Sequence, residues 1–184
     1  MQLFLVIVLG FSIAGTVITQ TPPQCLRPLK FGTTCSTAQP SIRYHFDSET
    51  NLCMAFKYNG CGGNKNNFES DGVCRAVCLP TDLVGCPLGK KPLEKPDGIS
   101  SCSSDTDCTA KGYCSKRLSG SGICCRIAVR DKIQSDYNPS CAKGRAVVKV
   151  DDSVLIGKNC SSNFCPTDAN CRKGNFFSSC CGKV

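Results

Sequence analysis

The sequence predicts a small, disulfide-rich protein built of several modules. The chain holds 18 cysteines in 184 residues, a density typical of disulfide scaffolds exported to an oxidising compartment. The cysteines fall into three groups of six, separated by cysteine-free stretches, at 25–78, 86–125 and 141–181. Each group is too short to be stabilised by a hydrophobic core alone, so we expect disulfides to hold three separate modules together.

The N-terminus predicts a signal peptide over residues 1–20. Leu3 to Ile13 is a largely apolar run, too short for a membrane-spanning helix, which needs about 20 residues. Small residues follow at Ala14 and Gly15, as signal peptidase requires, although the n-region carries no Lys or Arg. We expect cleavage between residues 14 and 20 and a secreted, extracellular chain without a membrane span.

Charge and composition argue against several classes of function. The net charge of +8 is spread evenly over the three modules, whereas nucleic-acid binding needs clustered basic residues, so we expect no nucleic-acid partner. The single histidine, His45, lies in a predicted strand and is expected to be structural. Oxidised cysteines leave no thiol nucleophile, and zinc-type spacing is missing. We therefore expect no enzyme, cofactor or metal site.

The second and third modules form an internal repeat. Their spacings are C-x15-C-x5-C-x5-C-x9-C-C and C-x18-C-x4-C-x5-C-x8-C-C. Adjacent cysteines rarely bond each other, so each member of a terminal pair is expected to reach a separate partner. The sequence leaves the connectivity open. These modules are expected to be mostly irregular or β, with a hairpin over 146–157 and a turn at 96–98. Residues 79–85 and 126–140 are expected to be linkers.

The first module shows clearer local patterns. Residues 42–46 alternate between apolar and polar, residues 52–58 are interpreted as a second alternating strand, and 48–51 can turn between them, which predicts a β-hairpin. Ser70 can cap a short C-terminal helix. Cys74 and Cys78, four residues apart, would then share one face of that helix.

The spacing Cys25…Cys35…Cys53-x7-Cys61-x12-Cys74-x3-Cys78, together with the segment Phe56 to Phe68 (FKYNGCGGNKNNF), resembles the Kunitz, or bovine pancreatic trypsin inhibitor, domain. The resemblance covers residues 25–78. It implies an α+β fold of a twisted β-hairpin and a C-terminal helix. It also implies a buried Asn66, core positions for Phe56 and Tyr58, and the disulfides Cys25–Cys78, Cys35–Cys61 and Cys53–Cys74.

The two repeats resemble the lustrin-type cysteine-rich repeat, which accompanies Kunitz domains in secreted invertebrate, nematode-like proteins. This resemblance rests on the six-cysteine spacing, an early glycine and the terminal Cys-Cys. Nematode modules with eight cysteines and whey-acidic-protein domains are rival interpretations, but both usually carry two more cysteines than each repeat has here.

The Kunitz resemblance implies a protease-contact loop formed by Cys35, Ser36, Thr37, Ala38 and Gln39. Ser36 would enter the primary pocket of a serine protease. It carries no cation for the pocket carboxylate of trypsin-like enzymes, and its small side chain suits an elastase-like pocket better. Seven residues separate Cys35 from Arg43, two more than in the common family pattern, and both additions fall on the contact surface.

The sequence leaves two functions open. The first is a secreted serine-protease inhibitor whose specificity is not trypsin-like. The second is a non-inhibitory Kunitz module that binds partners in an extracellular matrix or cuticle, which Ser36 and the longer loop favour. Independently, Asn159-Cys160-Ser161 fits the N-glycosylation sequon.

Overall fold

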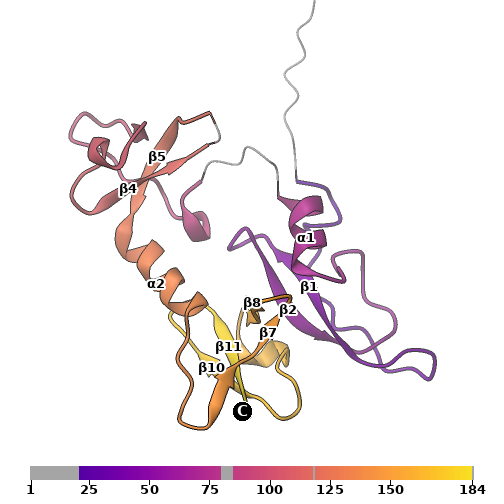
Figure 1. Cartoon of the computed structure of the whole chain (residues 1–184). Coiled ribbons are helices and arrows are strands. Elements are labelled where there is room, and N and C mark those ends of the chain that lie inside the picture. The colour runs from indigo at the N-terminus through magenta and orange to yellow at the C-terminus, as the bar shows by residue number, and fades with distance from the viewer. Residues whose placement is uncertain (1–20, 80–84, 118, 184) are drawn as a thin grey trace, which may run out of the picture.

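The computed structural model describes residues 21–79, 85–117 and 119–183 (Figure 1). The predicted signal peptide and most of the predicted linker at 79–85 lie outside these residues. All cysteines are described, and they form nine disulfides with none left free. Within the described ranges, no helix has both the length and the apolar character needed to cross a bilayer.

The first module is a β-hairpin followed by a short helix, which confirms the predicted fold. Strands β1 (Ser41–Asp47) and β2 (Leu52–Tyr58) pair antiparallel, with Ser41 opposite Tyr58 and Asp47 opposite Leu52. Helix α1 (Asp71–Cys78) begins after Ser70, whose hydroxyl accepts a hydrogen bond of 3.2 Å from the backbone N–H of Val73. This is the N-cap that the sequence predicted.

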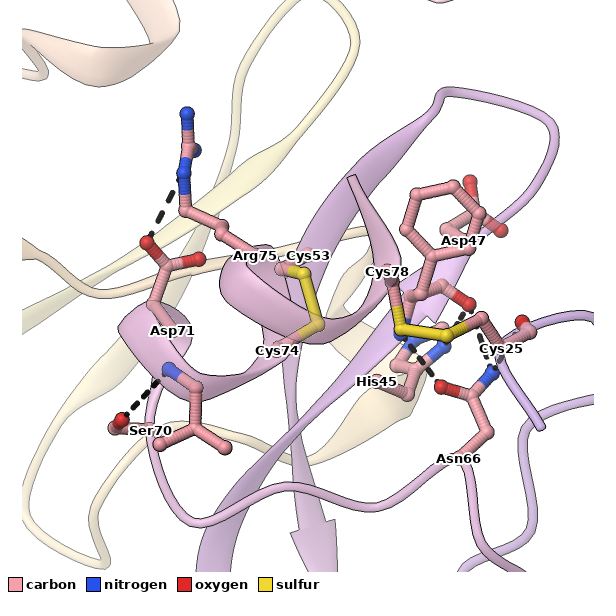
Figure 2. The surroundings of a disulfide bond; sticks show 12 residues. Cys25, His45, Asp47, Cys53, Asn66, Ser70, Asp71, Cys74, Arg75 and Cys78 are labelled. Atoms are coloured by element: carbon pink, nitrogen blue, oxygen red, sulfur yellow. Dashed lines mark hydrogen bonds and ion pairs between the residues drawn. A yellow bond between two sulfur atoms is a disulfide. The ribbon is translucent and has the colours of Figure 1, made fainter. Parts of the chain in front are cut away.

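Two buried disulfides attach α1 to the rest of the module (Figure 2). Cys74 joins Cys53 of β2, and Cys78 joins Cys25 near the start of the described chain. Both helical cysteines are fully buried, so they share the inward face of α1, as their spacing predicted. The helix has only eight residues and could not persist in isolation, so these links hold it in place.

Asn66 lies beside the Cys25–Cys78 disulfide and is almost completely buried (Figure 2). Its side-chain oxygen accepts a hydrogen bond from the backbone N–H of Phe46 at 2.8 Å. Its amide donates to the carbonyls of Cys25, Arg27 and Phe46 at 3.0, 2.8 and 2.9 Å. One side chain thus joins β1 to the N-terminal segment.

The second module is a small three-stranded sheet held by three disulfides. Its strands pair in the order β3-β5-β4. Its elements are η1 (Pro87–Gly89), β3 (Ser101–Cys102), η2 (Asp105–Asp107), β4 (Gly112–Lys116) and β5 (Gly122–Arg126). Its disulfides are Cys86–Cys125, Cys102–Cys114 and Cys108–Cys124. The turn expected at 96–98 is present, closed by a hydrogen bond from the Gly98 N–H to the Lys95 carbonyl.

The third module repeats this plan with more strands. Strand β11 pairs with β10, β6 and β9, and β7 pairs with β8. The elements are β6 (Arg145–Val147), β7 (Lys149–Val150), β8 (Ser153–Val154), β9 (Ile156–Gly157), η3 (Cys160–Ser162), β10 (Asn170–Lys173) and β11 (Ser178–Lys183). The disulfides are Cys141–Cys181, Cys160–Cys171 and Cys165–Cys180. In both repeats the adjacent cysteines bond separate partners, as expected.

Helix α2 (Ile127–Tyr137) lies within 126–140, the segment that we expected to be a linker. It leads from β5 of the second module to the third module (Figure 1). The buried carboxylate of Asp136, near its C-terminus, accepts hydrogen bonds from the backbone N–H groups of Asn175, Phe176 and Phe177. The helix is therefore joined to the third module by contacts distant in sequence, which a local pattern does not reveal.

The third module packs along β2 of the first module. The expected alternation over 52–58 is wrong for its central part, because residues 53–56 are all buried. Met54 is fully buried and belongs to one apolar cluster with Ile156 and Phe177 of the third module. The second face of β2 is thus covered by another part of the chain, so the hairpin has no open apolar face here.

Candidate functional site: the loop around Cys35

The loop expected to contact a protease is exposed at the surface of the first module. Ser36, Thr37 and Gln39 are exposed, whereas Cys35 and Ala38 are half-buried. Among the described residues, the Ser36 side chain has no hydrogen-bond partner, and Thr37 places its hydroxyl 3.5 and 3.6 Å from the sulfurs of Cys35 and Cys61. The outward side chains of this loop are therefore available to a partner.

The base of the loop is braced from both sides. The Cys35–Cys61 disulfide joins it to the segment that follows β2. Just before the loop, Thr33 and Cys61 exchange two backbone hydrogen bonds of 2.8 and 3.0 Å. Gly60 adopts φ 113°, and a Cβ at this position would lie 2.6 Å from the carbonyl oxygen of Ala38. Only glycine permits this close approach of the two segments.

An aromatic cluster supports the loop from below. The ring of Phe56, which is fully buried, makes edge contacts with Phe31 and Tyr58 at centroid distances of 6.1 and 6.5 Å. Tyr58 is half-buried and donates a hydrogen bond from its hydroxyl to the Gly62 carbonyl at 2.9 Å. The backbone N–H of Asn59 donates to the Phe31 carbonyl at 2.8 Å. Residues before and after the loop are therefore fixed relative to each other.

His45 lies away from this loop, in the middle of β1. It is opposite Met54 in the hairpin register, is 3% exposed and contacts the ring edge of Phe56. Burial lowers the pKa of His45 below its ordinary value, against the weaker opposing effect of Asp47. Burial therefore favours the uncharged form of the packed ring, which fits the structural role expected for His45.

The C-terminal side of the loop borders the third module. A groove of about 220 Å³ is lined there by Pro40, Ser41, Ile42, Lys57, Cys165, Pro166 and Thr167. A second groove, of about 460 Å³, shares Lys57, Cys165, Pro166 and Thr167 and continues to Asn59 and Asn163. No local pattern predicts that these two segments lie side by side, because more than 100 residues separate them in the sequence.

The sequon asparagine Asn159 is exposed in the third module. Its side-chain oxygen accepts a hydrogen bond from the Ser161 hydroxyl, so the two polar members of the sequon are already adjacent. Glycosylation of Asn159 stays a prediction.

Comparison with known families identifies the region that carries this loop. The family model described as the Kunitz/bovine pancreatic trypsin inhibitor domain matches residues 24–79. The matched residues contain the hairpin, α1 and the three disulfides of the first module.

Two nematode proteins are similar to nearly the whole chain. The major allergen Ani s 1 of Anisakis simplex is 34% identical over 168 residues, which cover 86% of each protein. A BPTI/Kunitz inhibitor domain-containing protein of Caenorhabditis elegans is 35% identical over 162 residues, covering 85% of this chain and 88% of the relative. PI-stichotoxin-Hcr2n of Radianthus crispa is 54% identical over 54 residues, which cover 29% of this chain and 91% of the toxin.

Proposed function

Because this chain belongs to the Kunitz/bovine pancreatic trypsin inhibitor family, we propose that it is a secreted inhibitor of serine proteases that acts through the loop around Cys35. Its partner is the protease, and its own role is binding without catalysis. The nine disulfides support an extracellular location, since such bonds persist in oxidising compartments.

The observation that carries this proposal is an exposed loop on a braced base. Ser36, Thr37 and Gln39 are exposed, whereas Cys35 is bonded to Cys61 and the adjoining backbone is paired through Thr33. A loop already held in one shape loses little conformational freedom when a protease binds it. The same bracing keeps the ends of the loop together if a bond within it is cut.

The specificity follows from the side chain at residue 36. Ser36 is neutral and short, so it cannot pair with the carboxylate at the base of a trypsin-like pocket. Filling such a pocket with a neutral group leaves that carboxylate without its counter-charge, which is costly when the pocket is closed to water. We therefore propose that the target has a small primary pocket, as in elastase-like enzymes.

A titration with the folded full chain tests this function. Elastase, chymotrypsin and trypsin are each incubated with increasing inhibitor, and residual hydrolysis of a small chromogenic substrate is measured. We expect the elastase-type enzyme to be inhibited and trypsin to stay active. If none of the three enzymes is inhibited at micromolar concentration, the inhibitory function is refuted.

The alternative function is a non-inhibitory binding module of an extracellular matrix or cuticle. It is favoured by the length of the segment between Cys35 and Arg43, which includes the exposed residues Gln39, Pro40 and Ser41. Ordering each additional residue costs about 1–2 kcal/mol. A loop that must be ordered on binding would lose affinity for a protease cleft. In the titration, elastase, chymotrypsin and trypsin would then all stay active.

A further inference from the structure

The third module is held against the first at the turn of the hairpin and along β2. At the turn end of the hairpin, the ammonium of Lys158 lies 2.9 Å from a carboxylate oxygen of Asp47 and 2.6 Å from one of Glu49. In the middle, Met54 packs in one apolar cluster with Ile156 and Phe177. Charged and apolar contacts together thus fix the position of the third module relative to the hairpin. Figure 1 shows β7 and β8 lying beside β2.

This docking places the segment between η3 and β10 beside the protease-contact loop. Cys165, Pro166 and Thr167 line the same groove as Pro40 to Ile42, the residues that continue the loop after Gln39. Pro166 and Thr167 are both exposed. A backbone hydrogen bond from the Ala169 N–H to the Pro166 carbonyl, 3.0 Å long, closes a turn here, and the Cys165–Cys180 disulfide fixes its start.

A protease bound to the contact loop would also lie close to this segment. When Ser36 occupies the primary pocket, the residues after it run along the enzyme surface on the leaving-group side of the cleft. Pro40 is only four positions beyond Ser36, which corresponds to at most about 14 Å of extended chain. A protease that covers the loop must therefore also approach the turn at Pro166 and Thr167.

We infer that residues 166 and 167 of the third module form a second part of the protease-contact surface and help to select the protease. This inference rests on the proposed inhibitory function. The partner is a serine protease whose surface beside the leaving-group side of the cleft fits against this turn. An enzyme with a bulky projection at that place is excluded by the third module, whatever its primary pocket accepts.

Substitution of Thr167 by tryptophan tests the inference in the full chain. Among the described residues the Thr167 side chain has no hydrogen-bond partner, so Thr167→Trp adds bulk to the contact surface without removing a structural contact. Ser103→Trp is the matched control, because Ser103 is an exposed residue of the second module. Both changes are also made in a chain that carries Ser36→Arg. Inhibition constants are measured against elastase for Thr167→Trp and Ser103→Trp alone. They are measured against trypsin for the same two changes combined with Ser36→Arg.

We expect Thr167→Trp to raise the inhibition constant at least about tenfold, mainly by slowing association, while Ser103→Trp leaves it within about twofold. Unfolding midpoints of the two variants should equal that of the parent. Equal inhibition constants for Thr167→Trp and Ser103→Trp would overturn this inference and leave the proposed function intact. If neither the natural chain nor Ser36→Arg inhibits any protease, the proposed function fails and the inference fails with it.

Discussion

At the scale of single residues, Asn66 makes more hydrogen bonds to backbone groups than any other side chain in the described part of the first module. It donates to Cys25, Arg27 and Phe46 and accepts from Phe46, all within 3.0 Å. A buried backbone group left without a partner costs about 1–3 kcal/mol. Replacement of Asn66 leaves several buried backbone groups without a hydrogen-bond partner at once, beside the Cys25–Cys78 disulfide.

We predict that Asn66→Ala lowers the free energy of unfolding by at least about 2 kcal/mol. Asn170→Ala is the control, because Asn170 is exposed at the start of β10 and should change stability by less than about 0.5 kcal/mol. Denaturant unfolding with the disulfides intact measures both values. Equal stabilities for the two variants would contradict the role given to Asn66.

Asp136 links pH to stability. Burial opposes its charge, but hydrogen bonds from the N–H groups of Phe176, Asn175 and Phe177 prevail and hold the pKa of Asp136 below its usual value of 3.8. Because the folded pKa is depressed, the stabilising contribution is complete above the unfolded pKa and is lost as pH falls through the folded value.

We predict that Asp136→Asn is less stable than the natural chain at pH 7, and that the difference shrinks as the pH is lowered below about 4. Asp131→Asn is the control, since Asp131 is an exposed residue of the same helix whose ion pair is with its neighbour Arg130. Urea unfolding at pH 7 and at pH 3 gives the comparison. A pH-independent difference for Asp136→Asn would exclude the ionised carboxylate as the stabilising group.

At the scale of elements, two disulfides of similar loop length have different environments. Cys53–Cys74 spans 21 residues and joins buried atoms of β2 and α1, whereas Cys35–Cys61 spans 26 residues and lies half-buried under the contact loop. The chain-entropy contribution depends only weakly on loop length, so it is nearly the same for both. The two disulfides therefore differ in effect because they differ in burial. Cys53–Cys74 supports the packing of α1, and Cys35–Cys61 supports the shape of the contact loop.

We predict that replacing Cys53 and Cys74 together by alanine costs about 2–5 kcal/mol and prevents folding of the first module at 37 °C. Replacing Cys35 and Cys61 together should leave a folded hairpin and helix. It should weaken protease binding by more than the accompanying loss of unfolding free energy accounts for. Circular dichroism and the inhibition assay, applied to both double variants, separate the two effects. Native-like unfolding of the first double variant would contradict the role of Cys53–Cys74.

The elements predicted from local patterns were those whose partners are close in sequence. The strand at 42–46 and the cap at Ser70 follow from residue periodicity and capping chemistry, and the structure has both. The second strand was placed correctly at 52–58, although the alternation expected there is wrong. Helix α2 was missed because its residues show no single apolar face, and its clearest tertiary contact is made by Asp136 with backbone about 40 residues later. The connectivity of the repeats likewise depends on which cysteines the folded strands bring together.

At the scale of the whole molecule, the first and third modules form one packed unit. The run from Leu52 to Phe56 contains only apolar residues, which in retrospect indicates a strand covered on both faces. The sequence could not say what covers it, because Ile156 and Phe177 lie more than 100 residues away. The same separation hid the turn at Pro166 and Thr167 from sequence reasoning.

We predict that Met54→Ala loosens both modules, because it leaves a cavity where Met54 meets Ile156 and Phe177. The expected loss of stability is about 2–5 kcal/mol, and hydrogen exchange should accelerate in β9 as well as in β2. Val73→Ala is the control, because Val73 lies on the exposed side of α1 and is 49% exposed. It should change neither the stability nor the hydrogen-exchange rates. Faster exchange confined to the first module would show that the third module is not docked through Met54.

Whether Ser36 enters the primary pocket of a serine protease is decided by the inhibition constants of Ser36→Arg against trypsin and elastase, measured beside those of the natural chain. An arginine at this position can pair with the carboxylate of the trypsin pocket, so we expect trypsin binding to improve at least about a hundredfold while elastase binding weakens. If both inhibition constants stay unchanged, residue 36 does not enter the pocket, and the assignment of the contact loop is contradicted.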